Sequence, residues 1–189
     1  MAEGLLIVRA FIGLLLLAHG LQKLIGWFGG HGLAGTGGFF EAVGHRPGRQ
    51  MAAAAGLSEA GGGALLTLGL LTPLAVAMIV GVMTVAAISV HAKNGLWATN
   101  GGYELPLTNA VVAAGLGFTG AGTWSVDHAI GLNLSGWGWG ILALVVGLIG
   151  ASVQLSRRNR ALAEADAYPA DTAVSEAETE ESARQSPRP

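Results

Sequence analysis

The sequence predicts an all-α integral membrane protein with five membrane-spanning helices and a disordered, charged C-terminal tail. Of the 189 residues, 51% are hydrophobic and only 12% are charged, whereas soluble domains carry roughly 25% charged residues. Several apolar runs approach the roughly 20 residues that a helix needs to cross the hydrocarbon core. The segment 156–189 instead is rich in Ala, Glu and Ser, a composition that cannot bury enough apolar surface to fold.

Each apolar run predicts one helix. We expect the first four at about 4–25, 51–71, 74–92 and 103–119, and a fifth that ends a 128–155 segment. Pro73 favours a helix start, because Pro fits the first turn.

The fifth run begins at Trp137 and contains no charge up to Leu155. Its small residues Ala143, Gly147 and Ala151 recur every four positions, which predicts close packing against another helix.

The positions of Lys and Arg predict the orientation in the membrane. With five spans, every connection that contains Lys or Arg falls on one face, and four spans would divide them between both faces. We therefore expect a multi-pass protein of the cell membrane, with the N-terminus outside and the tail 156–189 in the cytoplasm. The first connection reads as a flexible loop at the interface, anchored by its aromatic residues Trp27, Phe28, Phe39 and Phe40.

The composition excludes several kinds of chemistry. There is no cysteine, which rules out thiol chemistry, iron–sulfur ligation and covalent haem attachment. No basic stripe with interleaved aromatic residues is present, so nucleic acid is not an expected partner. Ligation of a metal by His19 and His91 is chemically possible, but no Glu-x-x-His pair occurs and we expect neither metal nor haem.

Ionisable residues within the predicted spans form the best candidate site, because charge in the membrane is costly and usually functional. On the first helix, Arg9, His19 and Lys23 fall within about 80° of one face. Glu59 lies about 12 Å deeper than Met51 on the second helix. In the five-span topology the candidates converge near the cytoplasmic face: His19, Lys23, Glu59, His91, Tyr103 and Glu104.

The alternative is structural: Glu59 pairs with Arg9 or Lys23 and holds the bundle in register. Snorkelling of its ammonium to the interface also explains part of the position of Lys23.

The same residues resemble short motifs of the DoxX family. These stretches run in order from about Leu5 to Asp127: His19-Gly20-Leu21-Gln22-Lys23-Leu24, Glu59 before Gly61-Gly62, Leu68-Gly69-Leu70-Leu71-Thr72-Pro73, His91 with Gly95, Gly101-Gly102-Tyr103-Glu104, Gly120-Ala121-Gly122, and Ser125 with Asp127. The resemblance implies a four-helix membrane domain over 1–127, to which this chain adds a fifth helix and the tail.

The resemblance also implies a function, because the family name derives from small membrane subunits of quinone-linked oxidoreductases. We therefore expect a subunit of such a complex, with a quinone as cofactor. His19 and His91 would hold the quinone carbonyls beside Gln22, while Glu59 or Glu104 passes protons.

Electrons would come from a soluble redox subunit docked on the cytoplasmic face. Two alternatives stay open, a membrane scaffold for cytoplasmic redox enzymes and a small-molecule carrier, and a homo-oligomer is compatible with each.

Overall fold

The structure is a computed structural model that describes residues 2–167, which form helices and turns without a β-strand. Its α-helices are α1 (Ala2–Ile25), α2 (Gly32–Ala42), α3 (Gly48–Leu68), α4 (Thr72–Ala86), α5 (Glu104–Thr119), α6 (Val126–Ala129) and α7 (Trp137–Ala167). The helix that starts as α4 continues through a π-turn, Ala87–His91, and a 3₁₀ turn, Ala92–Asn94. The all-α fold expected from the sequence is therefore confirmed.

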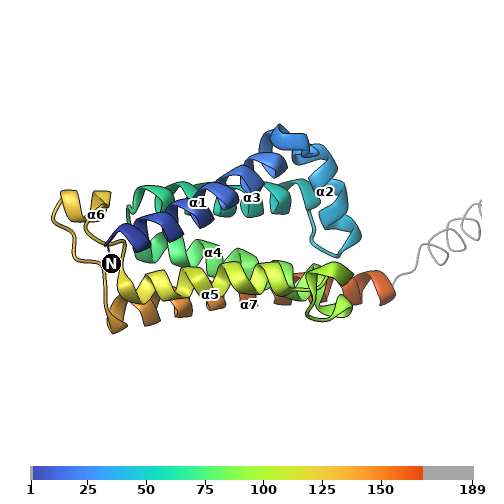
Figure 1. The fold of residues 1–189 in the computed structure, drawn as a ribbon. Helices are drawn as coiled ribbons and strands as arrows, with labels where there is room; N and C mark the ends of the chain where they lie inside the picture. The colour runs from blue at the N-terminus through green and yellow to red at the C-terminus, as the bar shows by residue number, and fades with distance from the viewer. Residues whose placement is uncertain (1, 168–189) are drawn as a thin grey trace, which may run out of the picture.

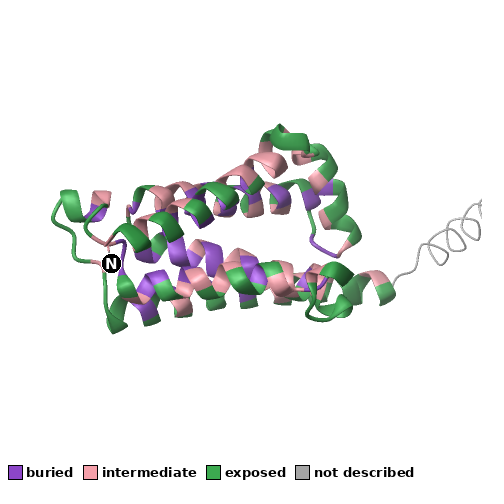
Figure 2. Ribbon diagram, in the orientation of Figure 1, coloured by how far each residue is buried: buried purple, intermediate pink, exposed green. Residues whose placement is uncertain are grey.

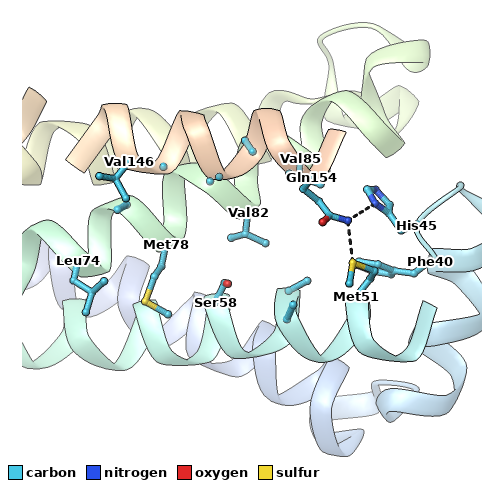
Figure 3. A pocket seen from close by; sticks show the side chains of 17 residues that line it. Phe40, His45, Met51, Ser58, Leu74, Met78, Val82, Val85, Val146 and Gln154 are labelled. Carbon is cyan, nitrogen blue, oxygen red and sulfur yellow. Dashed lines mark hydrogen bonds between the residues drawn. The ribbon is translucent and has the colours of Figure 1, made fainter. Parts of the chain in front are cut away.

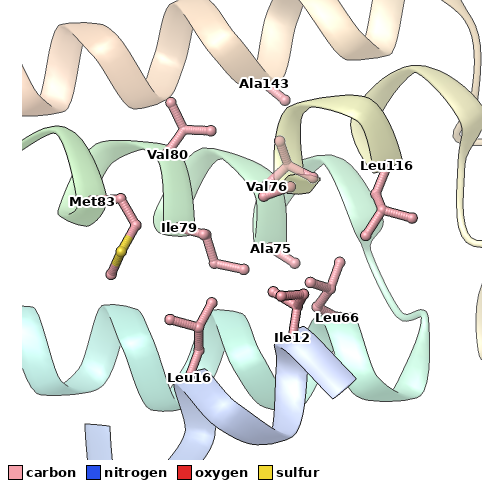
Figure 4. Close-up of a cluster of buried hydrophobic side chains, with 11 residues drawn as sticks. Ile12, Leu16, Leu66, Ala75, Val76, Ile79, Val80, Met83, Leu116 and Ala143 are labelled. Atoms are coloured by element: carbon pink, nitrogen blue, oxygen red, sulfur yellow. The ribbon is translucent and has the colours of Figure 1, made fainter. Parts of the chain in front are cut away.

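The long helices lie side by side, with α4 at the centre of the bundle (Figure 1). Helix α1 packs on α3, α3 packs on α4, and α4 packs on both α5 and α7. The buried hydrophobic core gathers around α4 (Figure 4): Ile12, Leu16, Leu66, Ala75, Val76, Ile79, Val80, Met83, Ala113, Leu116 and Ala143. Because these residues come from all five long helices, one core holds the bundle together.

Exposed residues cover much of the outside of the bundle (Figure 2), and many of them carry large apolar side chains. On α7 the exposed ones include Ile141, Leu142, Val145, Val146, Leu148 and Ile149. An apolar surface of this extent is unfavourable in water and natural in a bilayer. Three helices are long and apolar enough to cross a membrane, namely Ala2–Ile25, Thr72–Asn94 and Trp137–Ala167. The count of five spans stays a prediction, because α3 and the 16-residue α5 do not meet that measure.

Within residues 2–167 the basic side chains are concentrated at one end of the bundle. This basic end holds α2, the end of α1, the α4–α5 connection and the C-terminal part of α7 (Figure 1): Lys23, Arg46, Arg49, Lys93, Arg157, Arg158 and Arg160. Arg9 is the exception among the described residues, and it is buried near the opposite end.

Glycines bring α1 and α3 into close contact. A Cβ added to Gly20 would lie 2.6 Å from the carbonyl oxygen of Gly56 and 2.7 Å from Cβ of Ala60. About two turns earlier on α1, a Cβ on Gly13 would lie 2.6 Å from the carbonyl oxygen of Gly63. Small residues at such crossings let helix backbones approach where lipid gives no hydrophobic drive.

At the end of the bundle opposite the basic end, Arg9 and Asp127 hydrogen-bond to unpaired backbone groups at helix ends. Arg9, 2% exposed, donates hydrogen bonds to the carbonyls of Leu66 and Thr67 at the end of α3, and to that of Trp124. A cation at a helix C-terminus satisfies carbonyls that lack a helical partner. Arg9 therefore does not pair with Glu59.

Asp127 has the complementary role at the start of α4. Its carboxylate accepts the backbone N–H of Leu71 at 2.7 Å and that of Thr72 at 3.1 Å, and the Thr72 hydroxyl at 2.7 Å. An acidic side chain at this position caps the helix and suits its dipole. The short helix α6, which the sequence did not predict, thus holds an N-terminal cap for α4.

Two segments differ from the sequence-based expectation. The connection expected as a flexible loop contains α2, whose Gly37 lies against the backbone of Arg49 on α3. Tertiary packing therefore overrides the low helix propensity of its glycines. Trp27, Phe28 and Phe39 are exposed as expected of interface anchors, whereas Phe40 turns inward onto His45.

Helix α7 also extends to Ala167, so residues 156–167 are helical where a disordered tail was expected. This stretch is rich in Ala, Arg, Leu and Glu, which extend an existing helix without a new nucleation step. The rest of the predicted tail, 168–189, lies outside the described residues. As the spacing predicted, Ala143, Gly147 and Ala151 are buried on the inner face of α7.

Candidate functional site

An ion pair between α1 and α3 is the centre of the predicted site. The Lys23 ammonium contacts both carboxylate oxygens of Glu59. Side chains on a helix lean toward its N-terminus, and the two helices run in opposite directions. Lys23 therefore leans toward the middle of the bundle and Glu59 toward the basic end, which brings the two charges together.

The burial of the pair is unequal. Glu59 is 1% exposed, and the Lys23 side chain is 19% exposed. The idea that Lys23 snorkels to the interface is wrong, because its ammonium turns inward to Glu59. His19, one helical turn before Lys23, is exposed on the surface of α1 and lies near the charges of both partners. Its ring makes no hydrogen bond within the described residues, so both ring nitrogens are open to a ligand.

The second group of predicted residues lies in the connection from α4 to α5. His91 ends the π-turn that extends α4, and its Nδ1 lies 2.7 Å from the carbonyl oxygen of Gly101. Because a carbonyl only accepts, Nδ1 carries a proton and donates it to Gly101, and Nε2 remains open to a ligand. The Glu104 carboxylate accepts the backbone N–H of Ala98 at 2.8 Å, and Tyr103 closes the same turn through its N–H to Gly95.

The two groups share the basic end of the bundle, but no hydrogen bond or ion pair joins them within residues 2–167. His19, Lys23 and Glu59 form one cluster, which we call the α1–α3 cluster. His91, Tyr103 and Glu104 form a separate corner, the α4–α5 corner. Gln22, predicted as a cofactor contact, donates to the carbonyl of Phe28 at 3.0 Å. Its amide nitrogen thus supports the turn after α1.

The sequence reasoning missed a cavity of about 340 Å³ between α3, α4 and α7 (Figure 3). Its walls are apolar apart from Ser58 and a polar end formed by His45 and Gln154. In the sequence, His45 is one of several polar residues in the connection before α3, and nothing singles it out. Gln154 is more than 100 residues away. The packing of α4 on both α3 and α7 brings them within 3.0 Å.

His45 is 2% exposed and is fixed on both ring nitrogens. The Gln154 amide nitrogen donates to Nδ1 at 3.0 Å, so Nε2 carries the proton and donates to the Ser89 hydroxyl at 3.0 Å. Burial lowers the pKa of this imidazole, and the nearby positive charge of Arg158 lowers it further. His45, which lies in the connection before α3, is therefore held neutral.

Comparison with known proteins identifies the helical domain. Residues 4–92 match the model of the DoxX family. The chain belongs to the DoxX family. In this DoxX protein the matched segment contains α1 to α4 and ends just after His91, so the α1–α3 cluster lies wholly within it.

The remaining elements lie beyond the matched segment. Tyr103 and Glu104 on the α4–α5 corner are outside it, as are α6 and α7 with Gln154. No curated protein and no solved structure gives a significant match to the chain. The family match thus supports a DoxX membrane protein.

Proposed function

We propose that this DoxX protein is the membrane subunit of a quinone-linked oxidoreductase complex in the cell membrane, with its basic end in the cytoplasm. The observation that carries the proposal is the Lys23–Glu59 ion pair beside an open His19 within apolar helices. Ionisable groups at such depth are rare and are usually functional. The orientation is supported by the basic residues at one end of the bundle, since cytoplasmic loops are enriched in Lys and Arg.

The residues present fit the needs of a quinone. Its carbonyls require hydrogen-bond donors, and a bound quinone undergoes two-electron, two-proton reduction. His19 offers a ring N–H, and Glu59 offers a carboxylate that can hold and release a proton. His91, whose Nδ1 is held by Gly101, would contact the quinone through its Nε2.

The α1–α3 cluster can therefore hold a donor and a proton acceptor at one place in the membrane. The contact with the Lys23 ammonium fixes the Glu59 carboxylate beside His19. Since the sequence has no cysteine for an iron–sulfur cluster, we assign electron supply to a soluble partner at the basic end.

The test is a purification in mild detergent followed by extraction and quantification of quinone. We expect quinone to co-purify with the wild-type chain, and His19→Gln to reduce both its amount and quinol-dependent electron transfer in membranes. His91→Ala should reduce the same activity. His128→Ala serves as the matched control, because His128 is exposed at the opposite end of the bundle. Absence of quinone from the wild-type protein, with unchanged membrane activity in His19→Gln and His91→Ala, would refute the proposal.

A further inference from the structure

The cavity between α3, α4 and α7 has the shape of a site for a hydrocarbon chain (Figure 3). It follows α4 from Leu74 to Val85, which is about 16 Å of helix. Its volume of about 340 Å³ falls within the range of small-molecule pockets. The residues that line it from α4, among them Met78 and Val82, are all apolar, so this wall offers no polar group.

Two polar atoms face the cavity without a partner. The Ser58 hydroxyl makes no hydrogen bond within the described residues, whereas Thr67, Thr84 and Ser152 each donate to the carbonyl four residues earlier. Ser58 thus differs from these three hydroxyls, which are satisfied within their own helix. In Figure 3 its oxygen points into the space between α3 and α4.

The second open atom is the amide oxygen of Gln154. His45 and Met51 contact the amide nitrogen, each at 3.0 Å, so the oxygen lies on the side away from His45 and toward the cavity (Figure 3). This oxygen has no hydrogen bond within residues 2–167. Because an amide oxygen only accepts, its partner in the cavity must be a donor.

The uncharged lining of the cavity disfavours an ionic ligand. No charged side chain lines it. Arg158, one turn beyond Gln154, donates its Nε to the carbonyl of Val43 at 2.7 Å and does not line the cavity. A carboxylate or phosphate placed here would lose its water without gaining a counter-ion, which is costly.

We infer that this cavity binds an amphiphile with one hydrocarbon chain and an uncharged, hydroxyl-bearing head. The chain lies along α4, and the head donates to the Gln154 oxygen or exchanges a hydrogen bond with Ser58. An acyl lipid such as a monoacylglycerol and a reduced isoprenoid quinone share this chemistry. The inference does not depend on the proposed redox function, since an acyl lipid satisfies it equally.

The full chain in mild detergent can be tested by native mass spectrometry during titration with oleyl alcohol, whose head is a single neutral hydroxyl. Oleate is the matched competitor, because it carries the same chain on a charged head. Gly150→Phe fills the cavity, since Gly150 lines it and an added Cβ meets no atom within 4 Å. Gly138→Phe is the matched control, on the same helix with equally open space but outside the cavity.

We expect Gly150→Phe to weaken oleyl alcohol binding at least tenfold and Gly138→Phe to leave it unchanged, with equal thermal stability of the two variants. Ser58→Ala should weaken binding roughly threefold to tenfold, the worth of one hydrogen bond, while Ser152→Ala should not. Oleate should bind at least tenfold more weakly than the alcohol.

Equal binding to the Gly150→Phe and Gly138→Phe variants, or equal binding of oleate and oleyl alcohol, overturns the inference. A second readout comes from the molecules that the wild-type protein retains during purification. An extracted acyl lipid or an extracted quinol, lost from Gly150→Phe alone, supports the site and names the source. If no quinone is found but an acyl lipid is retained, the redox proposal fails and the cavity site stands.

Discussion

The ion pair between Lys23 and Glu59 gives the sharpest stability prediction, because its two partners are buried unequally. Lys23→Met leaves the Glu59 carboxylate, 1% exposed, without a counter-charge. Removing one partner of a buried pair costs about 3–5 kcal/mol of unfolding free energy. Glu59→Gln leaves a Lys23 side chain that is 19% exposed, and its ammonium can turn toward water on the flexible stem. We therefore expect that variant to cost less, about 1–3 kcal/mol.

The double variant Lys23→Met/Glu59→Leu separates charge from packing. Replacing a buried ion pair with apolar side chains of similar size is often neutral or stabilising, so this variant should recover most of the loss in Lys23→Met. Reversible unfolding in mixed detergent micelles, followed by circular dichroism, gives the four free energies of the double-mutant cycle. A cost of Lys23→Met at or below that of Glu59→Gln, or a double variant as unstable as the sum of the singles, would refute this reasoning.

Three further predictions concern helix ends, helix contact and pH. Asp127→Ala removes the cap of α4 and should lower the free energy of unfolding by about 1–3 kcal/mol, whereas His128→Ala should not; melting curves in detergent compare them. Gly20→Ala forces α1 and α3 apart and should cost about 1–3 kcal/mol, while Gly115→Ala, with nothing within 4 Å of the added Cβ, should be tolerated. Between the lowered folded pKa of His45 and its ordinary value of about 6.5, the unfolded chain binds more protons. The melting temperature of the wild type should therefore fall as pH drops below about 6.5, and His45→Gln should show a smaller fall across pH 8 to 5.

The helical fold and the α1–α3 contact were predictable because their signals are local. Apolar runs of helical length and costly charges within them are visible in the residues themselves. An acidic residue at Glu59 and a basic one at Lys23 on neighbouring antiparallel helices have few other partners at that depth. The choice between Arg9 and Lys23 required the structure, because Arg9 finds carbonyl partners at the end of α3.

The parts that sequence reasoning missed depend on contacts between distant segments. Gly-rich α2 has little helix propensity, and its helix is held by packing on α3. The cavity is invisible in the sequence because its polar end joins His45 to Gln154 across 109 positions. The sequence also does not show that the Ser58 hydroxyl lacks a hydrogen bond within residues 2–167, since a helix hydroxyl normally bonds to a carbonyl of its own helix.

Helix α3 separates the two candidate sites and makes their roles distinguishable. Glu59 faces α1 with Gly56 and Gly63, whereas Ser58 faces the cavity beside α4 and α7. Gly150→Phe changes only the cavity, and His19→Gln changes only the α1–α3 cluster. If quinol-dependent electron transfer is lost in His19→Gln and kept in Gly150→Phe, the redox site is the α1–α3 cluster and the cavity holds a lipid. If Gly150→Phe loses the activity together with a retained quinol while His19→Gln keeps it, the quinone head lies at Ser58 and Gln154, and the Lys23–Glu59 pair is structural.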